Sequence, residues 1–270
     1  MIKRYFITAF IIGAVIAFAF ALMAVLQQPS FTMIFQGVCA LMVMLYFGTL
    51  YVFTIPRNRS GLPLWTILIY LTGIAALVFN KLETRDLLTN FPTLGIMAGW
   101  WLYAFWYSGL GKRSGLEKGK KLPHFQVEDI DGKVIKSSTF GKSVIMFYRG
   151  NWCPFCMAQI KELISDYKKL SEKGAKLIFI SPQPAKKTIK LAKKFGVEAE
   201  FLIDREAEAA KTLNLFHENG TPIGLEVLGH DQDTVKPTVL VIDEKRSIVY
   251  SDLTENYRLR PKPSSYVQFF

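Results

Sequence analysis

Two cysteines separated by two residues are the part of this chain best suited to chemistry. They are Cys153 and Cys156, in the order Cys-Pro-Phe-Cys. A close pair of this kind either cycles between dithiol and disulfide or supplies half of a metal site. The third cysteine, Cys39, stands alone in an apolar run, where we expect it to be a small buried hydrophobic side chain. Three cysteines are too few for a disulfide-stapled secreted scaffold.

The residues around the pair place it at the start of a helix. The apolar run 143–148 suits a buried strand, whereas residues 157–172 show the apolar spacing of a helix. Proline fixes φ and lacks an N–H, so Pro154 suits the first helical position and Cys153 the N-cap. Free amide groups and the helix dipole stabilise a thiolate there, lowering a thiol pKa from about 8.5 toward ~3.5–7.5. This order of strand, turn and helix therefore predicts a reactive dithiol.

Two other interpretations of the pair stay open. A zinc site needs about four ligands. The three histidines, His124, His217 and His230, have no ligand-like spacing to the cysteines. A purely structural disulfide is the second alternative, although a helix-start position after a strand favours reactivity over stapling. We expect no metal and no bound cofactor.

Five neighbouring residues are further candidates for the site. Arg149 lies between the strand and the turn, where its charge holds a thiolate or a peroxide oxygen, or is simply a solvated loop charge. Trp152 and Phe155 are aromatic neighbours that could shield the pair and contact substrate. Pro237 directly precedes an expected strand, so its peptide bond is either cis, with the backbone close to the cysteines, or an ordinary trans bond. Lys236 beside it is a candidate substrate-binding residue.

The composition divides the chain into two dissimilar halves. Of its 270 residues 50% are hydrophobic, yet the formal net charge is +11. Residues 5–110 are nearly free of charge, whereas the chain from Lys112 onward is rich in lysine and glutamate. We therefore expect a transmembrane helical domain at 1–111, a basic linker at 112–121 and a second domain at 122–270.

Four stretches of the first half carry no ionisable side chain except tyrosine and cysteine. They are residues 5–26, 31–55, 62–79 and 91–110. At ~1.5 Å per residue even the shortest covers about 27 Å, close to the hydrocarbon thickness of a bilayer. We expect all four to span the membrane as an α-helical bundle. A cleaved signal peptide is the alternative for residues 1–26, but its apolar core exceeds the roughly 7–15 residues of such peptides.

The distribution of positive charge favours one orientation in the membrane. Lys3 and Arg4 precede the first stretch, Arg57 and Arg59 separate the second from the third, and further lysines follow the fourth. Because basic loops stay on the cytoplasmic side, four spans place both termini and the second domain there. We expect a multi-pass protein of the inner cell membrane, with the lipid bilayer as a partner. No nucleic-acid motif accompanies the lysines, so we do not expect nucleic acid as a partner.

The second half alternates strand-like and helix-like patterns. Asp131-Gly132 between short apolar runs is a hairpin signal. Further strands are expected at 176–180, 200–203, 238–242 and 247–250, and further helices at 185–195 and 206–213. This alternation predicts an α/β domain with a mostly parallel sheet and helices on both faces.

Four motifs of the second half match a known family. They are F-x-V-x-D-x-D-G-K (125–133), F-Y-R-G-N-W-C-P-F-C (147–156), K-P-T-V-L-V-I-D (236–243) and N-Y-R-L-R-P-K-P (256–263). From about Leu122 the sequence resembles the AhpC/TSA-type redoxins, which are peroxiredoxin-like proteins of the thioredoxin superfamily. The resemblance implies a thioredoxin-like fold and thiol-dependent reduction of peroxides or disulfides. It also implies reducing equivalents from a thioredoxin- or glutathione-type donor.

The cysteine motif departs from the usual peroxiredoxin pattern, P-x-x-x-T-x-x-C. Aligned without gaps, Cys156 takes the peroxidatic position, Cys153 replaces the threonine and Arg149 replaces the proline. In thioredoxins the first cysteine attacks, so the sequence leaves open which sulfur attacks first. We expect a membrane-anchored thiol peroxidase in which one cysteine becomes a sulfenate that the other resolves as a disulfide. A thioredoxin-like disulfide oxidoreductase and a redox sensor or interaction module are the alternatives.

Overall fold

The computed structural model describes residues 2–53, 57, 61–83, 87–112, 114–196, 198–253, 255–263, 265 and 268–269. The chain separates into two compact units. We call Ile2–Phe53 with Asn58–Gly109 the helical unit, and Leu110–Phe270 with Thr54–Arg57 the α/β unit. Arg59, one of the basic residues used to orient the first half, lies outside the described residues.

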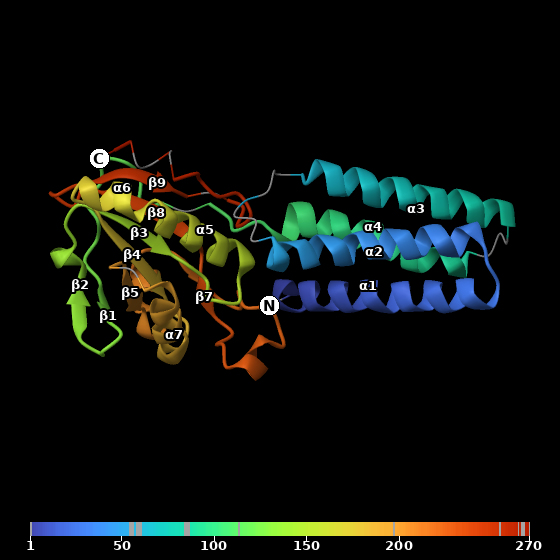
Figure 1. Ribbon diagram of the computed structural model, residues 1–270, viewed down its shortest axis with the longest axis horizontal. Coiled ribbons are helices and arrows are strands. Elements are labelled where there is room, and N and C mark those ends of the chain that lie inside the picture. Colours follow the sequence, from blue (N-terminus) through green and yellow to red (C-terminus); the bar gives the residue numbers. More distant parts are fainter. Residues whose placement is uncertain are drawn as a thin grey trace. The chain divides into compact units, whose positions relative to one another are not determined.

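The helical unit consists of apolar helices packed side by side (Figure 1). They are α1 (Ile2–Gln27), α2 (Phe31–Val52), α3 (Pro63–Glu83) and α4 (Phe91–Trp101), which continues as a π-helix over Leu102–Tyr107. Within the described residues, the first three are long and apolar enough to cross a membrane. The fourth expected span is α-helical only up to Trp101, so its crossing of the membrane stays a prediction.

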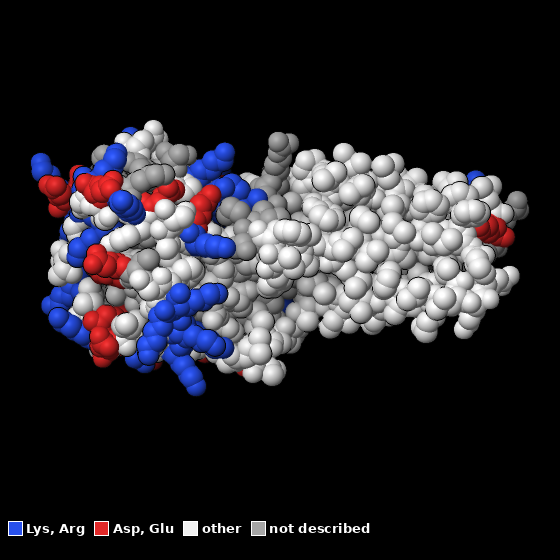
Figure 2. All heavy atoms as spheres, in the orientation of Figure 1, with Lys and Arg blue, Asp and Glu red and all other residues white. Residues whose placement is uncertain are grey.

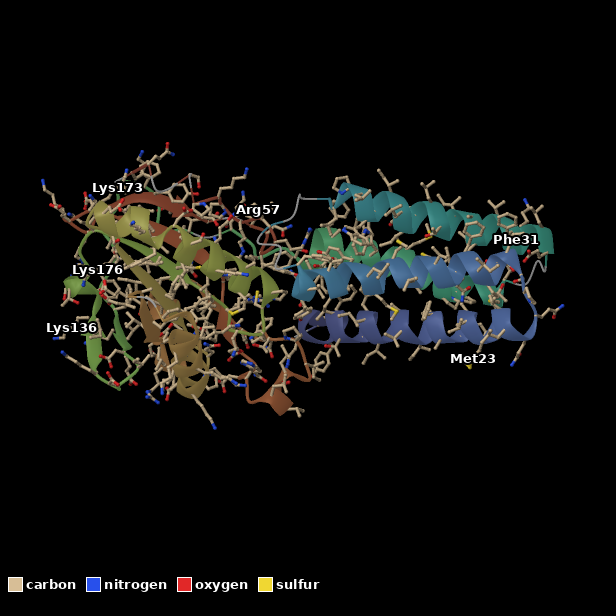
Figure 3. The ribbon with its side chains drawn as sticks, viewed as in Figure 1. Met23, Phe31, Arg57, Lys136, Lys173 and Lys176 are labelled. Atoms are coloured by element: carbon tan, nitrogen blue, oxygen red, sulfur yellow. The ribbon has the colours of Figure 1, made fainter. Side chains whose placement is uncertain are left out.

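The surface of the helical unit is apolar. The face seen in Figure 2 is almost free of charged side chains, which gather instead on the α/β unit. Met23 and Phe31 point outward from the helices, with exposed fractions of 57% and 58% (Figure 3). Contiguous exposed apolar surface of this extent is unusual in a water-soluble monomer and suits contact with lipid.

Several polar groups of the helical unit pair with one another. The Tyr46 and Tyr103 hydroxyls, both buried, lie 3.0 Å apart. The Glu83 carboxylate accepts hydrogen bonds from the backbone N–H groups of Phe31 (3.0 Å) and Thr32 (3.2 Å) at the start of α2. A carboxylate there satisfies free amides and opposes the positive end of the helix dipole. The loops between these helices are therefore held by specific hydrogen bonds.

The α/β unit is built on a seven-stranded sheet in the order β2-β1-β5-β4-β3-β8-β9, with a separate pair β6-β7. The strands of the large sheet are β1 (Gln126–Glu128), β2 (Val134–Lys136), β3 (Ser143–Phe147), β4 (Lys176–Ser181), β5 (Glu200–Ile203), β8 (Thr238–Ile242) and β9 (Ile248–Asp252). The small pair is β6 (Phe216–His217) and β7 (Thr234–Val235). The expected hairpin at Asp131-Gly132 is confirmed as the β1–β2 connection.

The prediction of a mostly parallel sheet was wrong. Only β3, β4 and β5 run parallel to one another within the described sheet, and the other neighbours pair antiparallel. The difference arises because β1–β2 and β8–β9 are joined by tight turns, and a tight turn can only join antiparallel strands. Helical crossovers, which produce parallel pairs, are confined to the centre of the sheet.

Helices cover both faces of the sheet, as predicted. They are α5 (Pro154–Ser165), α6 (Tyr167–Glu172), α7 (Ala185–Phe195) and α8 (Glu208–Thr212). The Phe195 ring of α7 stacks on Phe201 of β5, with centroids 6.3 Å apart. Leu202 points to the opposite face, where it shares a core with Ala209 and Ala210 of α8. The helix expected over 157–172 is interrupted at Asp166, which separates α5 from α6.

The central strand delivers the cysteine motif to one edge of the sheet. All five residues of β3 are buried, and the chain passes from Phe147 into α5 within a short turn. Thr238, the first residue of β8, pairs with Phe147. The residue before it, Pro237, therefore lies at the same edge of the sheet as the cysteine turn.

Replacing Gly196 by alanine should loosen α7. Gly196 ends the helix in the left-handed conformation, at φ 58° and ψ 31°, and its N–H donates to the Ala192 carbonyl (3.1 Å). Alanine in this conformation costs about 1–2 kcal/mol. We expect hydrogen exchange of α7 amides in the full chain to accelerate roughly fivefold or more. Gly141→Ala is the control, because Gly141 has open space around its Cα and no positive φ; equal exchange in both variants would contradict the prediction.

Candidate active site

The cysteine turn has the predicted position at the start of a helix. Cys153 is the N-cap of α5, with φ −87° and ψ 109°, and Pro154 occupies the first turn. The Met157 N–H donates to the Cys153 carbonyl (3.0 Å), and the Cys153 N–H donates to Gly150 (3.2 Å). Both cysteines are free thiols and both are buried. The placement of the pair at a helix N-terminus is confirmed.

The turn before the cysteines is held by the side chain of Gln183, which the sequence analysis did not single out. Its Oε1 accepts a hydrogen bond from the Asn151 N–H (2.8 Å). Its Nε2 donates to the Tyr148 hydroxyl (3.0 Å) and to Thr188 Oγ1 (3.0 Å). One buried amide thus ties the end of β3, the cysteine turn and the first turn of α7 together.

Gly150 allows the backbone of the turn to lie close to the indole ring of Trp152. Its φ is +148°, and a Cβ at this position would lie 2.7 Å from Nε1 of Trp152. Only glycine combines this conformation with such a close approach. The contact fixes Trp152 beside the cysteine pair, where the sequence placed it as an aromatic shield.

Arg149 is buried beside the turn, so the alternative of a solvated loop charge is wrong. Its exposed fraction is 5%, and its Nη2 donates to the Gly220 carbonyl. The guanidinium carbon lies 4.6 Å from the Trp152 ring centroid and 5.1 Å from that of Tyr257. Thr234 Oγ1 donates to the Arg149 carbonyl (2.7 Å). Cation–π contacts of this kind help to stabilise a buried guanidinium.

A second arginine, Arg260, reaches the site from the C-terminal segment. Its Nη2 donates to Sγ of Cys156 at 3.8 Å, and its exposed fraction is 6%. Nearby, the ring of Tyr257 packs edge-on against Phe155, with centroids 5.7 Å apart. This segment is one of the four family motifs of the second half, but Arg260 was not predicted to belong to the site. The motif N-Y-R-L-R-P-K-P was the only signal that could have identified it.

The two thiols differ sharply in acidity. Burial opposes ionisation of Cys153, but the Cys156 thiol hydrogen bond and the charges of Arg149 and Arg260 outweigh it and lower the pKa of Cys153 to about 6. Burial, followed by the hydrogen bond and charge of Cys153, raises the pKa of Cys156, and Arg260 counteracts this in part. The surroundings therefore favour the thiolate at Cys153 and the neutral thiol at Cys156.

Pro237 and Lys236 lie at the same edge of the sheet. No cis peptide bond occurs in the described chain, so the bond before Pro237 is trans. Pro237 is buried, whereas Lys236 is half-buried and its N–H donates to the Leu215 carbonyl (2.6 Å). Their roles in substrate binding stay predictions.

Cys39 is separate from this site. It is buried in the helical unit, as predicted, and its thiol donates to the Ile69 carbonyl at 3.4 Å. Among the described residues no group of three His, Cys, Asp or Glu side chains is arranged to hold a metal ion.

The alkylation rate of Cys153 should depend on pH with a midpoint below that of an ordinary thiol. Because only the thiolate reacts and the pKa of Cys153 is lowered to about 6, we expect the iodoacetamide rate of the full chain to be half-maximal near that pH. The rate should stay high above that midpoint and fall as the thiolate is protonated below it. Removing a nearby charge with Arg149→Met should raise the midpoint by about one pH unit or more. Peptide mass spectrometry separates Cys153 from Cys39; a midpoint near that of an ordinary thiol would contradict the prediction.

Comparison with known proteins identifies the family of the C-terminal part. Residues 118–251 match the model of the AhpC/TSA family. The thiol-disulfide oxidoreductase ResA of Bacillus cereus is 31% identical over 116 residues, which cover 42% of this chain and 65% of that protein. The chloroplastic peroxiredoxin Q of Triticum aestivum is 33% identical over 98 residues, or 36% of this chain and 45% of that protein.

The matched region thus spans just under two thirds of the ResA relative. Among solved structures, the peroxidoxin BcpB from Mycobacterium tuberculosis aligns with a TM-score of 0.45 and 21% identity, covering 53% of this chain and 90% of that one. The family match falls on the segment that carries the hairpin, the cysteine turn and the β8–β9 pair. Residues 118–251 of this chain are therefore a domain of the AhpC/TSA family.

Proposed function

We propose that this chain is a membrane-anchored thiol–disulfide oxidoreductase in which Cys153 attacks and Cys156 resolves. The observation that carries the proposal is the position of the two thiols: Cys153 is the N-cap of α5, and Cys156 is buried one turn inside the helix in contact with the guanidinium of Arg260. The surroundings lower the pKa of Cys153 and raise that of Cys156, which agrees with this order. A low pKa makes a thiol both a thiolate at neutral pH and a good leaving group. The relatives named thiol-disulfide oxidoreductase support the same chemistry.

The reaction takes two exchange steps. The Cys153 thiolate attacks one sulfur of a substrate disulfide, which forms a mixed disulfide and releases the other sulfur as a thiolate. Cys156 then loses its proton and attacks Cys153 Sγ, which forms the Cys153–Cys156 disulfide and releases the second substrate thiolate. A thioredoxin- or glutathione-type dithiol donor returns the pair to the reduced state.

Peroxide reduction is the second candidate, and burial of the site favours it. Cys153 has an exposed fraction of only 1%, so a small hydroperoxide reaches it more readily than a protein disulfide does. In that reaction the thiolate takes one peroxide oxygen and becomes a sulfenate, and the remainder leaves as an alcohol or water. Cys156 would then displace the sulfenate oxygen as water. The relative named peroxiredoxin Q supports this alternative.

The difference in acidity between the two thiols favours disulfide exchange over the thiol peroxidase expected from the sequence. The gapless alignment gave Cys156 the peroxidatic position, yet Cys156 is fully buried and its pKa is raised. A thiol in that state is a poor first nucleophile. Attack by the first cysteine of the pair instead follows the thioredoxin pattern, so disulfide exchange comes first and peroxide reduction second.

Trapping the mixed disulfide tests the order of attack. We expect Cys156→Ser to accumulate a mixed disulfide on Cys153 when the full chain in detergent is mixed with an oxidised insulin-type substrate, because no thiol remains to resolve it. Cys153→Ser should trap about tenfold less or lower still, because Cys156 is completely buried and burial keeps its pKa raised even without Cys153. Cys39→Ala is the matched control and should turn over like the unaltered protein.

Three outcomes would decide against the proposal. Trapping on Cys156 in the Cys153→Ser variant would reverse the order of attack. Turnover of hydrogen peroxide by the unaltered protein, without insulin-type exchange, would favour the peroxidase. Loss of activity in Cys39→Ala would move the site into the helical unit.

We further propose that the helical unit crosses the membrane four times. Its three long helices and its apolar exterior support insertion. The α and π turns from Phe91 to Tyr107 together cover about 25 Å, the lower end of the length that spans a bilayer. With four spans the basic segments at Lys3, Arg57 and Lys112 share the cytoplasmic side, and the α/β unit lies there too.

A reporter fusion tests the sidedness. A fluorescent protein that matures only in the cytoplasm, fused after Phe270, should fluoresce, because an even number of spans returns the chain to the side of its N-terminus. A periplasm-active phosphatase at the same position should stay inactive. The reverse pattern would mean an odd number of spans and would contradict the proposal.

A further inference from the structure

Arg260 is a buried cation with few hydrogen-bond acceptors around its guanidinium group in the reduced protein. Its exposed fraction is 6%, and its Nη2 donates to Cys156 Sγ at 3.8 Å. Its Nε and Nη1 are buried and have no hydrogen-bond partner among the described residues. A guanidinium buried for structural reasons is normally held by carboxylate or carbonyl oxygens. Here the side-chain acceptor that the structure provides is a sulfur atom.

A sulfur acceptor changes in strength during the proposed reaction. A neutral thiol accepts a hydrogen bond weakly, whereas a thiolate is an anion that pairs strongly with a guanidinium. A buried guanidinium without strong hydrogen-bond acceptors is unfavourable, because it has lost its hydration and regains little in return. The contact between Arg260 and Cys156 therefore stabilises the protein more strongly when Cys156 is a thiolate than when it is a neutral thiol.

The guanidinium groups of the two arginines have different contacts in the site. The guanidinium of Arg149 is bound to the Gly220 carbonyl and lies against the rings of Trp152 and Tyr257. Arg260, by contrast, is in direct contact with Cys156. Both charges act on Cys153, while Arg260 is the charge that acts on Cys156.

We infer that Arg260 is a catalytic residue for the second exchange step, in which it stabilises the Cys156 thiolate that resolves the mixed disulfide. This inference rests on the proposed function. Once Cys153 is bound to substrate, its negative charge no longer opposes ionisation of Cys156, and Arg260 remains as the neighbouring cation. Cys156 gives up its proton, its sulfur bonds to Cys153, and the bond from Cys153 to the substrate sulfur breaks. The pair is oxidised by two electrons and the substrate disulfide is reduced to two thiolates.

A chromogenic aryl disulfide separates the two steps in one experiment. Attack by Cys153 on bis(nitrobenzoate) disulfide releases one coloured thiolate, and attack by Cys156 releases the second. The full chain carries Cys39→Ala throughout, so that only the pair reports. We expect Arg260→Met to slow the second phase about ten- to a hundredfold at about pH 8, where Cys153 is ionised with or without Arg260. The first phase should change by less than about threefold.

Methionine is chosen because it fills similar volume and leaves no buried unpaired N–H. Replacing buried charge by such a side chain is often neutral or stabilising, so we expect the variant to fold. Arg260→Lys keeps the charge and should restore part of the second phase. Lys262→Gln is the matched control, because Lys262 is exposed on the same segment; both its phases should equal those of the unaltered protein.

The pH dependence distinguishes catalysis from a structural role. If Arg260 acts on thiolate formation, the deficit of Arg260→Met should shrink as the pH is raised and Cys156 ionises unaided. A second phase unchanged in Arg260→Met, or slowed equally at every pH, overturns the inference while the proposed function stands. Release of a single coloured thiolate by the unaltered pair contradicts the proposed function and the inference together.

Discussion

A thiolate is unfavourable inside a protein unless positive charge is buried with it, and the α/β unit brings that charge from two distant parts of the chain. Arg149 belongs to the turn itself, whereas Arg260 arrives 104 residues after Cys156. Each guanidinium then needs its own support. The Gly220 carbonyl and two aromatic rings hold Arg149. Gly220 lies between β6 and β7, Trp152 in the cysteine turn and Tyr257 in the C-terminal segment. The loop between β6 and β7 and the C-terminal segment thus both contribute to holding positive charge beside the cysteine pair.

The helical unit satisfies the opposite requirement. It presents apolar side chains outward and pairs several of its polar groups internally, as in the contact between Tyr46 and Tyr103. Within residues 1–111 Cys39 is the only cysteine, so this unit has no dithiol of its own through which electrons could pass. Its composition is therefore that of an anchor. The chemistry of the chain is concentrated in the α/β unit, where the charged residues also gather (Figure 2).

Features fixed by neighbouring residues could be predicted from the sequence. The helix start at Cys153, the hairpin at Asp131-Gly132 and the helix end at Gly196 each depend on a few adjacent side chains and backbone angles. Features fixed by distant contacts could not. The sheet is mixed because strand direction depends on the length and path of each connection. Arg260 and the Gln183 hydrogen bonds escaped notice because no local pattern links them to the cysteines.

The position of each sulfur, rather than its residue type, makes the pair asymmetric. Cys153 caps the helix, where the free amides, the neighbouring thiol and two guanidinium groups all favour its anion. Cys156 lies inside the helix, where burial and the neighbouring Cys153 favour the neutral thiol, and the charge of Arg260 and a backbone hydrogen bond from Arg149 oppose them in part. Cys153, which stands where peroxiredoxins usually have a threonine, is thus the stronger acid of the two. In the proposed cycle it therefore makes the first attack. Cys156, in the peroxidatic position, has its pKa raised in part by the charge of Cys153. In the proposed cycle it therefore ionises only after Cys153 has bonded to the substrate. In the proposed cycle Arg260, which contacts Cys156 Sγ, is the cation that favours this ionisation at the second step.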